Sequence, residues 1–316
     1  RLNEPEGRAP LSIMTNQVDP ERPQVADCHA EGVSMEVHTL THPCPLLDKG
    51  DFEAAAKTYH GGVDLLNQIE GNTPVAFRMP CCDSMNSPSP RFYREIFEQR
   101  SDEQHFLTID SSVCVVLTDE DPALPRGLVV DPDGKPRFGK YVPSEGFVNW
   151  MENYPYPYLI DRLCWEFPCM VPSDWEAQNL HGVNNPKTIE DWKRALDAVV
   201  IKQGVFTMVF HPHGWIGPEQ VVEFIDYASK TYGNRVRFLN FKEAQERIDT
   251  HRPDIVLMDI SMPGLNGLQA AEQLLKRHPQ VRIVFLSMHT EGEYVLAALR
   301  AGASGYLIKD SCLQEL

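Results

Sequence analysis

Apolar residues in the first 250 positions follow two alternating patterns, short continuous runs and longer stretches with 3–4 residue spacing. The short runs predict strands, and the spaced stretches predict amphipathic helices. Predicted strands cover 9–15, 33–39, 74–80, 106–112, 204–214 and 235–241; predicted helices cover 21–32, 51–71, 89–100, 185–203 (capped by Asn185 or Thr188), 218–233 and 242–252. Strands that alternate with helices indicate parallel βαβ units and an α/β fold.

The pattern becomes more regular after about residue 251. Short runs at 254–260, 281–287 and 305–308 predict strands, with helices at 267–278 and 291–302 between them. The Pro- and Trp-rich loops of residues 120–190 have no counterpart here. We therefore expect two domains, 1–248 and 249–316, joined through the helix 242–252 without a flexible linker.

Composition and charge exclude some classes of protein. The 316 residues are 42% hydrophobic and 23% charged, with a net charge of −16. Such an acidic surface repels phosphate backbones and anionic lipids, so we expect no nucleic-acid or membrane partner. No run reaches the roughly 18–20 apolar residues of a spanning helix. The first residues contain no apolar leader and the eight cysteines are dispersed, so we expect reduced thiols and a cytoplasmic location.

Polar residues with metal or acid–base chemistry follow several of the predicted strands. His38 and His42 stand four residues apart after the strand 33–39, and one helical turn capped by Thr39 would bring their imidazoles to one side. Neutral imidazoles bind zinc or a similar divalent metal. An HxxxH pair also occurs by chance in ordinary turns.

Three further strand ends or loops carry candidate groups. Arg78 follows the strand 74–80 and could orient a carboxylate, or could be a surface residue in a turn. His211, with His213 as the alternative, could act as a general acid, and Asp174 could tune a nearby histidine. Polar loops without function are the alternative for both.

These motifs, in order, resemble those of the polysaccharide deacetylase family over residues of about 10–247. They are H-TLT-H at His38 and His42, FRMP around Arg78, PSDW at 172–175 and VFHPHGW around His211. The resemblance implies a distorted (β/α) barrel and a hydrolase that removes acetyl groups from N-acetylated sugars or opens a related amide. A carbohydrate or small amide would be the substrate.

The resemblance also implies residue roles. His38 and His42 would bind the divalent metal, Arg78 would orient a carboxylate, and His211, near Asp174, would protonate the departing amine. The family's first motif, an Asp pair that supplies the base and a third ligand, is not found before His38, and the chain is expected to begin after it. Asp83 or Asp110 are the possible substitutes, whereas Asp19 lies in an unsuitable turn.

The tail resembles the receiver domain of bacterial response regulators, especially the LuxR-type group, over residues of about 251–316. RPDIVLMDISMPGLNG contains Asp259, VRIVFLS ends in Ser287, and GYLIKD contains Tyr306 and Lys309. The resemblance implies a partial flavodoxin-like βαβαβ unit.

In that family Asp259 would accept a phosphoryl group, Ser287 and Lys309 would contact it, and Tyr306 would be the switch aromatic. A histidine kinase would be the partner and Mg²⁺ the cofactor, although the acidic pair that holds Mg²⁺ is missing. Phosphoryl-accepting signalling is thus the alternative to the hydrolase function. Residues 235–260 also fit a receiver's second strand, second helix and third strand, as expected where two βα units of similar shape are joined.

Overall fold

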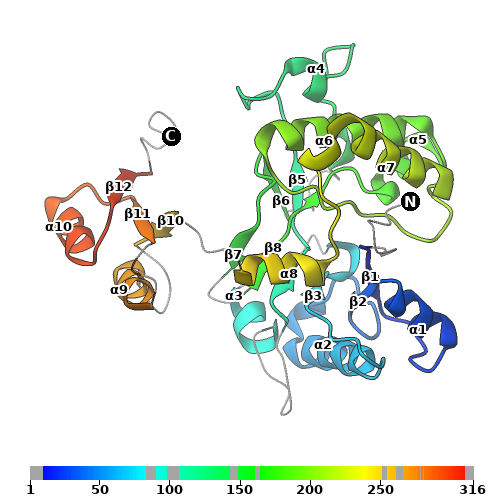
Figure 1. Cartoon of the computed structure of the whole chain (residues 1–316), viewed down its shortest axis with the longest axis horizontal. Coiled ribbons are helices and arrows are strands. Elements are labelled where there is room, and N and C mark those ends of the chain that lie inside the picture. The colour runs from blue at the N-terminus through cyan, green and yellow to red at the C-terminus, as the bar shows by residue number, and fades with distance from the viewer. Residues whose placement is uncertain are drawn as a thin grey trace. The chain divides into compact units, whose positions relative to one another are not determined.

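A computed structural model describes residues 10–82, 90–97, 107–142, 149–160, 164–250, 255–260, 266–277, 279 and 281–309. The chain divides into two compact units, Arg1–Glu246 and Arg247–Leu316. The division falls inside one helix, Phe241–Thr250. Figure 1 labels most of the helices and strands of both units.

The first unit contains two largely parallel sheets. The larger sheet has the strand order β1 (Ser12–Thr15), β2 (Ser34–Val37), β3 (Ala76–Phe77), β4 (Ile109–Asp110), β8 (Cys164–Glu166) and β7 (Tyr158–Ile160), of which only β7 is antiparallel to its neighbour. The smaller has the order β6 (Trp150–Glu152), β5 (Cys114–Val116) and β9 (Cys169–Met170). Parallel strands confirm the α/β class. The described strands form two separate sheets rather than the closed barrel that the deacetylase resemblance implied.

Helices cover these sheets. They are α1 (Pro23–Ala30), α2 (Phe52–Asn67), α3 (Pro90–Phe92), α4 (Arg126–Val129), α5 (Asp174–His181), α6 (Pro186–Lys202), α7 (Pro218–Tyr232) and α8 (Phe241–Thr250). The predicted helix 89–100 is described as α3 followed by a π-helical turn, Tyr93–Phe97. Asn185 caps α6 as expected, because its side chain accepts a hydrogen bond from the Lys187 N–H.

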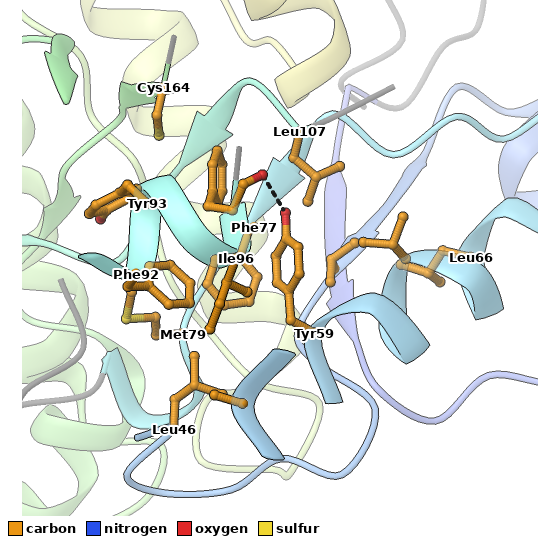
Figure 2. Packing of buried hydrophobic residues seen from close by; sticks show 14 of the residues in the cluster. Leu46, Tyr59, Leu66, Phe77, Met79, Phe92, Tyr93, Ile96, Leu107 and Cys164 are labelled. Carbon is orange, nitrogen blue, oxygen red and sulfur yellow. Dashed lines mark hydrogen bonds between the residues drawn. The ribbon is translucent and has the colours of Figure 1, made fainter. Parts of the chain in front are cut away.

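An aromatic core lies between α2, the π-helical turn and the larger sheet. Tyr59 of α2 packs edge-on against Phe77 of β3, and Phe97 closes the cluster from the π-helical turn. Figure 2 labels Tyr59 and Phe77, and its dashed line marks the hydrogen bond that the Tyr59 hydroxyl donates, which the carbonyl of Phe97 accepts. This core holds β2 and β3 in place, and the candidate site lies on the loops that follow these two strands.

Two predicted strands are not strands in the structure. Among the described residues, 204–210 make one isolated bridge, Thr207 with Cys169. The Thr207 and Val209 carbonyls accept hydrogen bonds from the N–H groups of Met170 and Asp174. Residues 236–240 alternate in exposure as a strand would, but they have no strand neighbour among the described residues. An apolar alternation shows that a segment has two different faces, but a strand also needs a partner for its backbone.

The second unit has a three-stranded parallel sheet, in the order β10 (Ile255–Asp259), β11 (Arg282–Ser287), β12 (Gly305–Ile308). Helices α9 (Gly267–Arg277) and α10 (Gly292–Arg300) connect the strands, which confirms the predicted βαβαβ unit. Its core centres on Ile283, Phe285, Ala271 and Ala298, all completely buried. Across the described part of the chain, no helix has both the length and the apolar character to cross a membrane.

Candidate functional sites

The first candidate site begins at the loop after β2. The Nδ1 atom of His38 lies 2.8 Å from the carbonyl oxygen of Arg78. A carbonyl can only accept, so Nδ1 carries the proton and the lone pair is on Nε2. The expected helical turn is wrong, because Thr39 and His42 both have a left-handed backbone, with φ of 63° and 53°. Even so, the Thr39 hydroxyl accepts from the His42 N–H, and the two imidazole rings lie 4.8 Å apart.

Burial keeps His38 neutral. It lowers the pKa of His38 to about 3, further assisted by the nearby charges of His42, Arg78 and His211.

The histidine pair does not by itself make a metal centre. A neutral imidazole with a free Nε2 is a suitable ligand, but catalytic zinc sites use three protein ligands. No group of three His, Cys, Asp or Glu side chains that could hold a metal ion occurs among the described residues. The predicted zinc site at His38 and His42 is therefore not supported.

Arg78 is held from the neighbouring strand end. Its Nε donates to the Ser111 carbonyl at 2.7 Å, and its Nη2 donates to the Ser111 hydroxyl at 2.9 Å. Ser111 is buried and its hydroxyl donates in turn to the carbonyl of Phe167. The guanidinium plane is thus fixed by the backbone of the segment after β4. Sequence inspection missed Ser111, because nothing distinguishes one serine of the pair in FLTIDSS from the other.

Asp174 and His211 form the most precisely built pair of the site. Asp174 is 1% exposed in the first turn of α5, which Ser173 caps. Its Oδ1 lies 2.7 Å from His211 Nδ1, and its Oδ2 accepts the His211 backbone N–H at 2.8 Å. The imidazole is therefore oriented at two points and presents Nε2. Trp215 packs 4.9 Å from the His211 ring and Trp175 is exposed beside Asp174.

Of the two expected substitutes for the catalytic carboxylate, Asp83 lies outside the described residues. Asp110 is completely buried at the end of β4, where Tyr93 Oη and Ser112 Oγ donate to its two oxygens at 2.5 Å each. Because both oxygens are used inside the protein, Asp110 is not placed to activate a water.

Glu166 is a buried carboxyl that sequence inspection also missed. It pairs with Asp110 across β4 and β8 and is completely buried. Burial, and then the nearby charge of Asp110, raise the pKa of Glu166 well above its usual range. Burial likewise raises the pKa of Asp110. Two adjacent buried carboxyls cannot both ionise at low cost, so the pair retains a proton.

The cysteines depart from the expectation of reduced thiols alone. Cys44, two residues after His42, forms a disulfide with Cys81, three residues after Arg78. The bond joins the loops that follow β2 and β3. These loops follow adjacent parallel strands, which explains why the two cysteines meet, although 37 residues separate them.

The second candidate site lies at the carboxyl edge of the C-terminal sheet. Asp259 ends β10 and its carboxylate forms an ion pair with the amine of Lys309, directly after β12. Ser287 ends β11, is 1% exposed, and accepts the His289 N–H at its hydroxyl. Tyr306 donates its hydroxyl to the His289 carbonyl at 2.8 Å. The structure therefore brings all four predicted residues to one sheet edge or to the loop beside it.

A close approach of backbone shapes this edge. The N–H of Gly267 donates to the Ile260 carbonyl at 3.0 Å, so α9 begins against the end of β10. A Cβ at Gly267 would lie 2.0 Å from the Asp259 carbonyl oxygen. Only glycine fits there.

Comparisons with known proteins concern this part of the chain. Residues 219–316 match the response regulator receiver domain family. The transcriptional regulatory protein DegU of Brevibacillus brevis is 44% identical over 69 residues, which are 22% of this chain and 29% of DegU. The response regulator GacA of Pseudomonas viridiflava is 37% identical over 75 residues, or 24% of this chain and 35% of GacA. The chain thus spans about a third of the length of these curated relatives.

A two-component response regulator of the LuxR family from Aurantimonas sp. SI85-9A1 is a structural match. It is 24% identical, and the match covers 42% of this chain and 74% of that one. The TM-score is 0.21, too low to carry a structural inference. The family match and these relatives support a receiver domain in the C-terminal part, and they give no support to a deacetylase domain in the residues before it.

The receiver match and the compact units do not share a boundary. The match begins at residue 219, whereas the first unit continues to Glu246. Within this overlap α7 packs Phe224 against Trp192 of α6, and the Phe241 N–H donates to the Ser12 hydroxyl of β1. Residues 219–246 therefore match a receiver in sequence while they pack in the first unit.

Proposed function

We propose that the C-terminal unit accepts a phosphoryl group on Asp259. The observation that carries the proposal is the ion pair of Asp259 with Lys309 at the carboxyl edge of a parallel sheet, within a segment that matches the receiver family. A carboxylate oxygen of Asp259 attacks the phosphorus, the donor's phosphoryl bond breaks, and an acyl phosphate forms. Lys309 neutralises the added charge, and the Ser287 hydroxyl turns to donate to a phosphate oxygen.

A histidine kinase is the proposed phosphoryl donor, because receiver domains of response regulators commonly pair with one. Mg²⁺ is the metal that receivers typically use, and it would neutralise phosphate oxygens when bound. Asp259 is a suitable oxygen ligand. The described residues, however, contain no three-ligand group for a metal, so they do not by themselves make up the Mg²⁺ site.

The phosphorylation test uses the full chain with acetyl phosphate and Mg²⁺, followed by intact mass. We expect the mass gain of one phosphoryl group, absent in Asp259→Asn. Asp226→Asn is the matched control, because Asp226 also pairs with a lysine, Lys230, but lies on α7. No gain in the unaltered chain, or an equal gain in Asp259→Asn, would reject the proposal.

A second candidate function, amide hydrolysis, is favoured by the Asp174–His211 pair. A buried carboxylate that holds Nδ1–H leaves Nε2 to give a proton to a departing amine. The substrate class taken from the motifs is an N-acetylated sugar or a related amide. This function rests on geometry and motif order.

The hydrolysis test measures acetate release from N-acetylglucosamine oligomers. We expect His211→Ala to lower the rate by at least about 100-fold, as for loss of a general acid. His213→Ala is the matched control, since its ring stacks on His211 but lies outside the Asp174 pair. Equal losses of rate in His211→Ala and His213→Ala would reject the role assigned to His211. The same assay with a metal chelator added tests whether the activity needs a metal.

A further inference from the structure

Three free cysteines meet where the turn after β3 packs against the smaller sheet. Cys114 begins β5 and Cys169 begins β9, and their Cα atoms are partners in the parallel register of these two strands. Both residues are buried, and the partly exposed Cys82 packs against the core cluster that contains them. Asn149 holds the same segments together, because its carbonyl accepts the Cys114 N–H at 2.8 Å and its amide donates to the Cys82 carbonyl at 3.5 Å.

The three thiols differ in their hydrogen bonds. Cys82 makes side-chain hydrogen bonds with both of the others, and the bond with Cys114 is the largest cause of the raised pKa of Cys82. The same bond acts to lower the pKa of Cys114, although burial and the charges of nearby groups leave it raised. Cys82 is thus the donor and Cys114 the acceptor of this contact. The Cys169 thiol donates to the Ser111 carbonyl at 3.1 Å, so its hydrogen is already used.

We propose that Cys82 and Cys114 are an oxidation site, at which a hydroperoxide joins the two sulfurs in a disulfide. The Cys114 thiolate attacks one peroxide oxygen, the O–O bond breaks, and a sulfenic acid forms. The Cys82 sulfur then attacks the sulfenic sulfur and the S–O bond breaks, so that two thiols and one hydrogen peroxide give one disulfide and two waters. Because no three His, Cys, Asp or Glu side chains among the described residues form a group that could hold a metal ion, these thiols fit covalent pairing rather than metal binding.

The new bond would join the two sheets of the first unit. Cys82 follows β3 of the larger sheet, whereas Cys114 belongs to β5 of the smaller one. The existing disulfide, Cys44–Cys81, joins only the two loops that follow β2 and β3 of the larger sheet. Oxidation would therefore fix the turn after β3 relative to β5. This inference is independent of both proposed functions.

The oxidation test treats the full chain with an excess of hydrogen peroxide, alkylates the remaining thiols and maps the peptides by mass spectrometry without reduction. We expect a cross-linked Cys82–Cys114 peptide pair, with both sulfurs protected from alkylation. Cys82→Ser should lack the pair, and Cys82→Ala serves if the serine variant does not fold. Cys28→Ser is the matched control and should form the pair as the unaltered chain does, because Cys28 is also a partly exposed free thiol but lies on α1.

Four outcomes would overturn the inference. Cys82 and Cys114 that both remain alkylatable would show that the pair does not react with peroxide. Sulfinic or sulfonic acid on either residue without a cross-link would show that the two sulfurs do not meet. A cross-link of Cys82 to Cys169 would reject the assigned partner. A cross-link of Cys82 to Cys44, with Cys81 released as a thiol, would show exchange with the existing disulfide in place of oxidation.

Discussion

At the scale of single residues, burial decides which groups of the first site are charged. His38 stays neutral because its surroundings exclude water, and its Nδ1–H is committed to the Arg78 carbonyl. The pair of Glu166 and Asp110 retains a proton for the same reason. Arg78 cannot lose its proton, so it is the group that keeps its charge. The residue types were readable from the sequence, but these protonation states depend on neighbours that come from other strands.

Glu166→Gln is expected to change how stability depends on pH. The folded pKa of Glu166 is raised above its unfolded value, so its contribution is full below about pH 4.5 and is lost as pH rises toward the folded pKa. Gln keeps the Oε1 acceptor for the Ser112 and Val113 N–H groups. Relative to the variant, the unaltered chain should lose about 1.4 kcal/mol of unfolding free energy per pH unit in this range. Urea unfolding of both proteins at several pH values measures this difference in slope. Unfolding free energies that change equally with pH in the two proteins would contradict the prediction.

At the scale of elements, α2 determines the shape of the loop that carries both histidines. Thr39 takes a left-handed backbone directly above Gly62 of α2, and the Leu40 N–H donates to the Thr58 carbonyl. A Cβ at Gly62 would lie 2.9 Å from the Thr39 carbonyl carbon. The two adjacent glycines of this helix, Gly61 and Gly62, are visible in the sequence. The close approach of the loop, which requires glycine at position 62, is not.

Gly62→Ala is expected to destabilise the first unit by about 1–3 kcal/mol, the usual range for overpacking against a backbone. Gly127→Ala, in α4, is the matched control, because a Cβ there meets nothing within 4 Å. It should be neutral or stabilising by up to about 1 kcal/mol through helix propensity. Chemical denaturation compares them, and equal free energies would refute the packing role of Gly62.

At the scale of the whole molecule, the chain combines two cores of different size. Phe77 is completely buried in the core of the first unit and Phe285 in that of the second. Within the described residues, β10 pairs with β11 alone and leaves a strand edge, with Leu257 52% exposed. A small sheet with an open edge gains less from burial than a larger one. We therefore expect the second unit to be the less stable.

Calorimetry of the full chain should give two thermal transitions. The transition at lower temperature should be that of the second unit. Phe285→Ala removes about 3–5 kcal/mol of unfolding free energy and should lower the midpoint temperature of that transition only. Phe77→Ala should lower only the midpoint of the later transition, that of the first unit. Hydrogen exchange should assign α7 to the second transition, although its sequence belongs to the receiver match. One cooperative transition moved by both substitutions would contradict this prediction.

The sequence by itself determined the α/β class, most helices, the βαβαβ tail and the residue types at the strand ends, because periodicity and turn residues are local properties. Within the described residues, tertiary structure decided that 204–210 make a single bridge, that 236–240 have no strand neighbour, and that the strands of the first unit form two sheets. It also decided that Cys44 meets Cys81 and that Ser111 holds Arg78. These features join segments far apart in the chain. Their free energies depend on which strands become neighbours, and no local pattern specifies that.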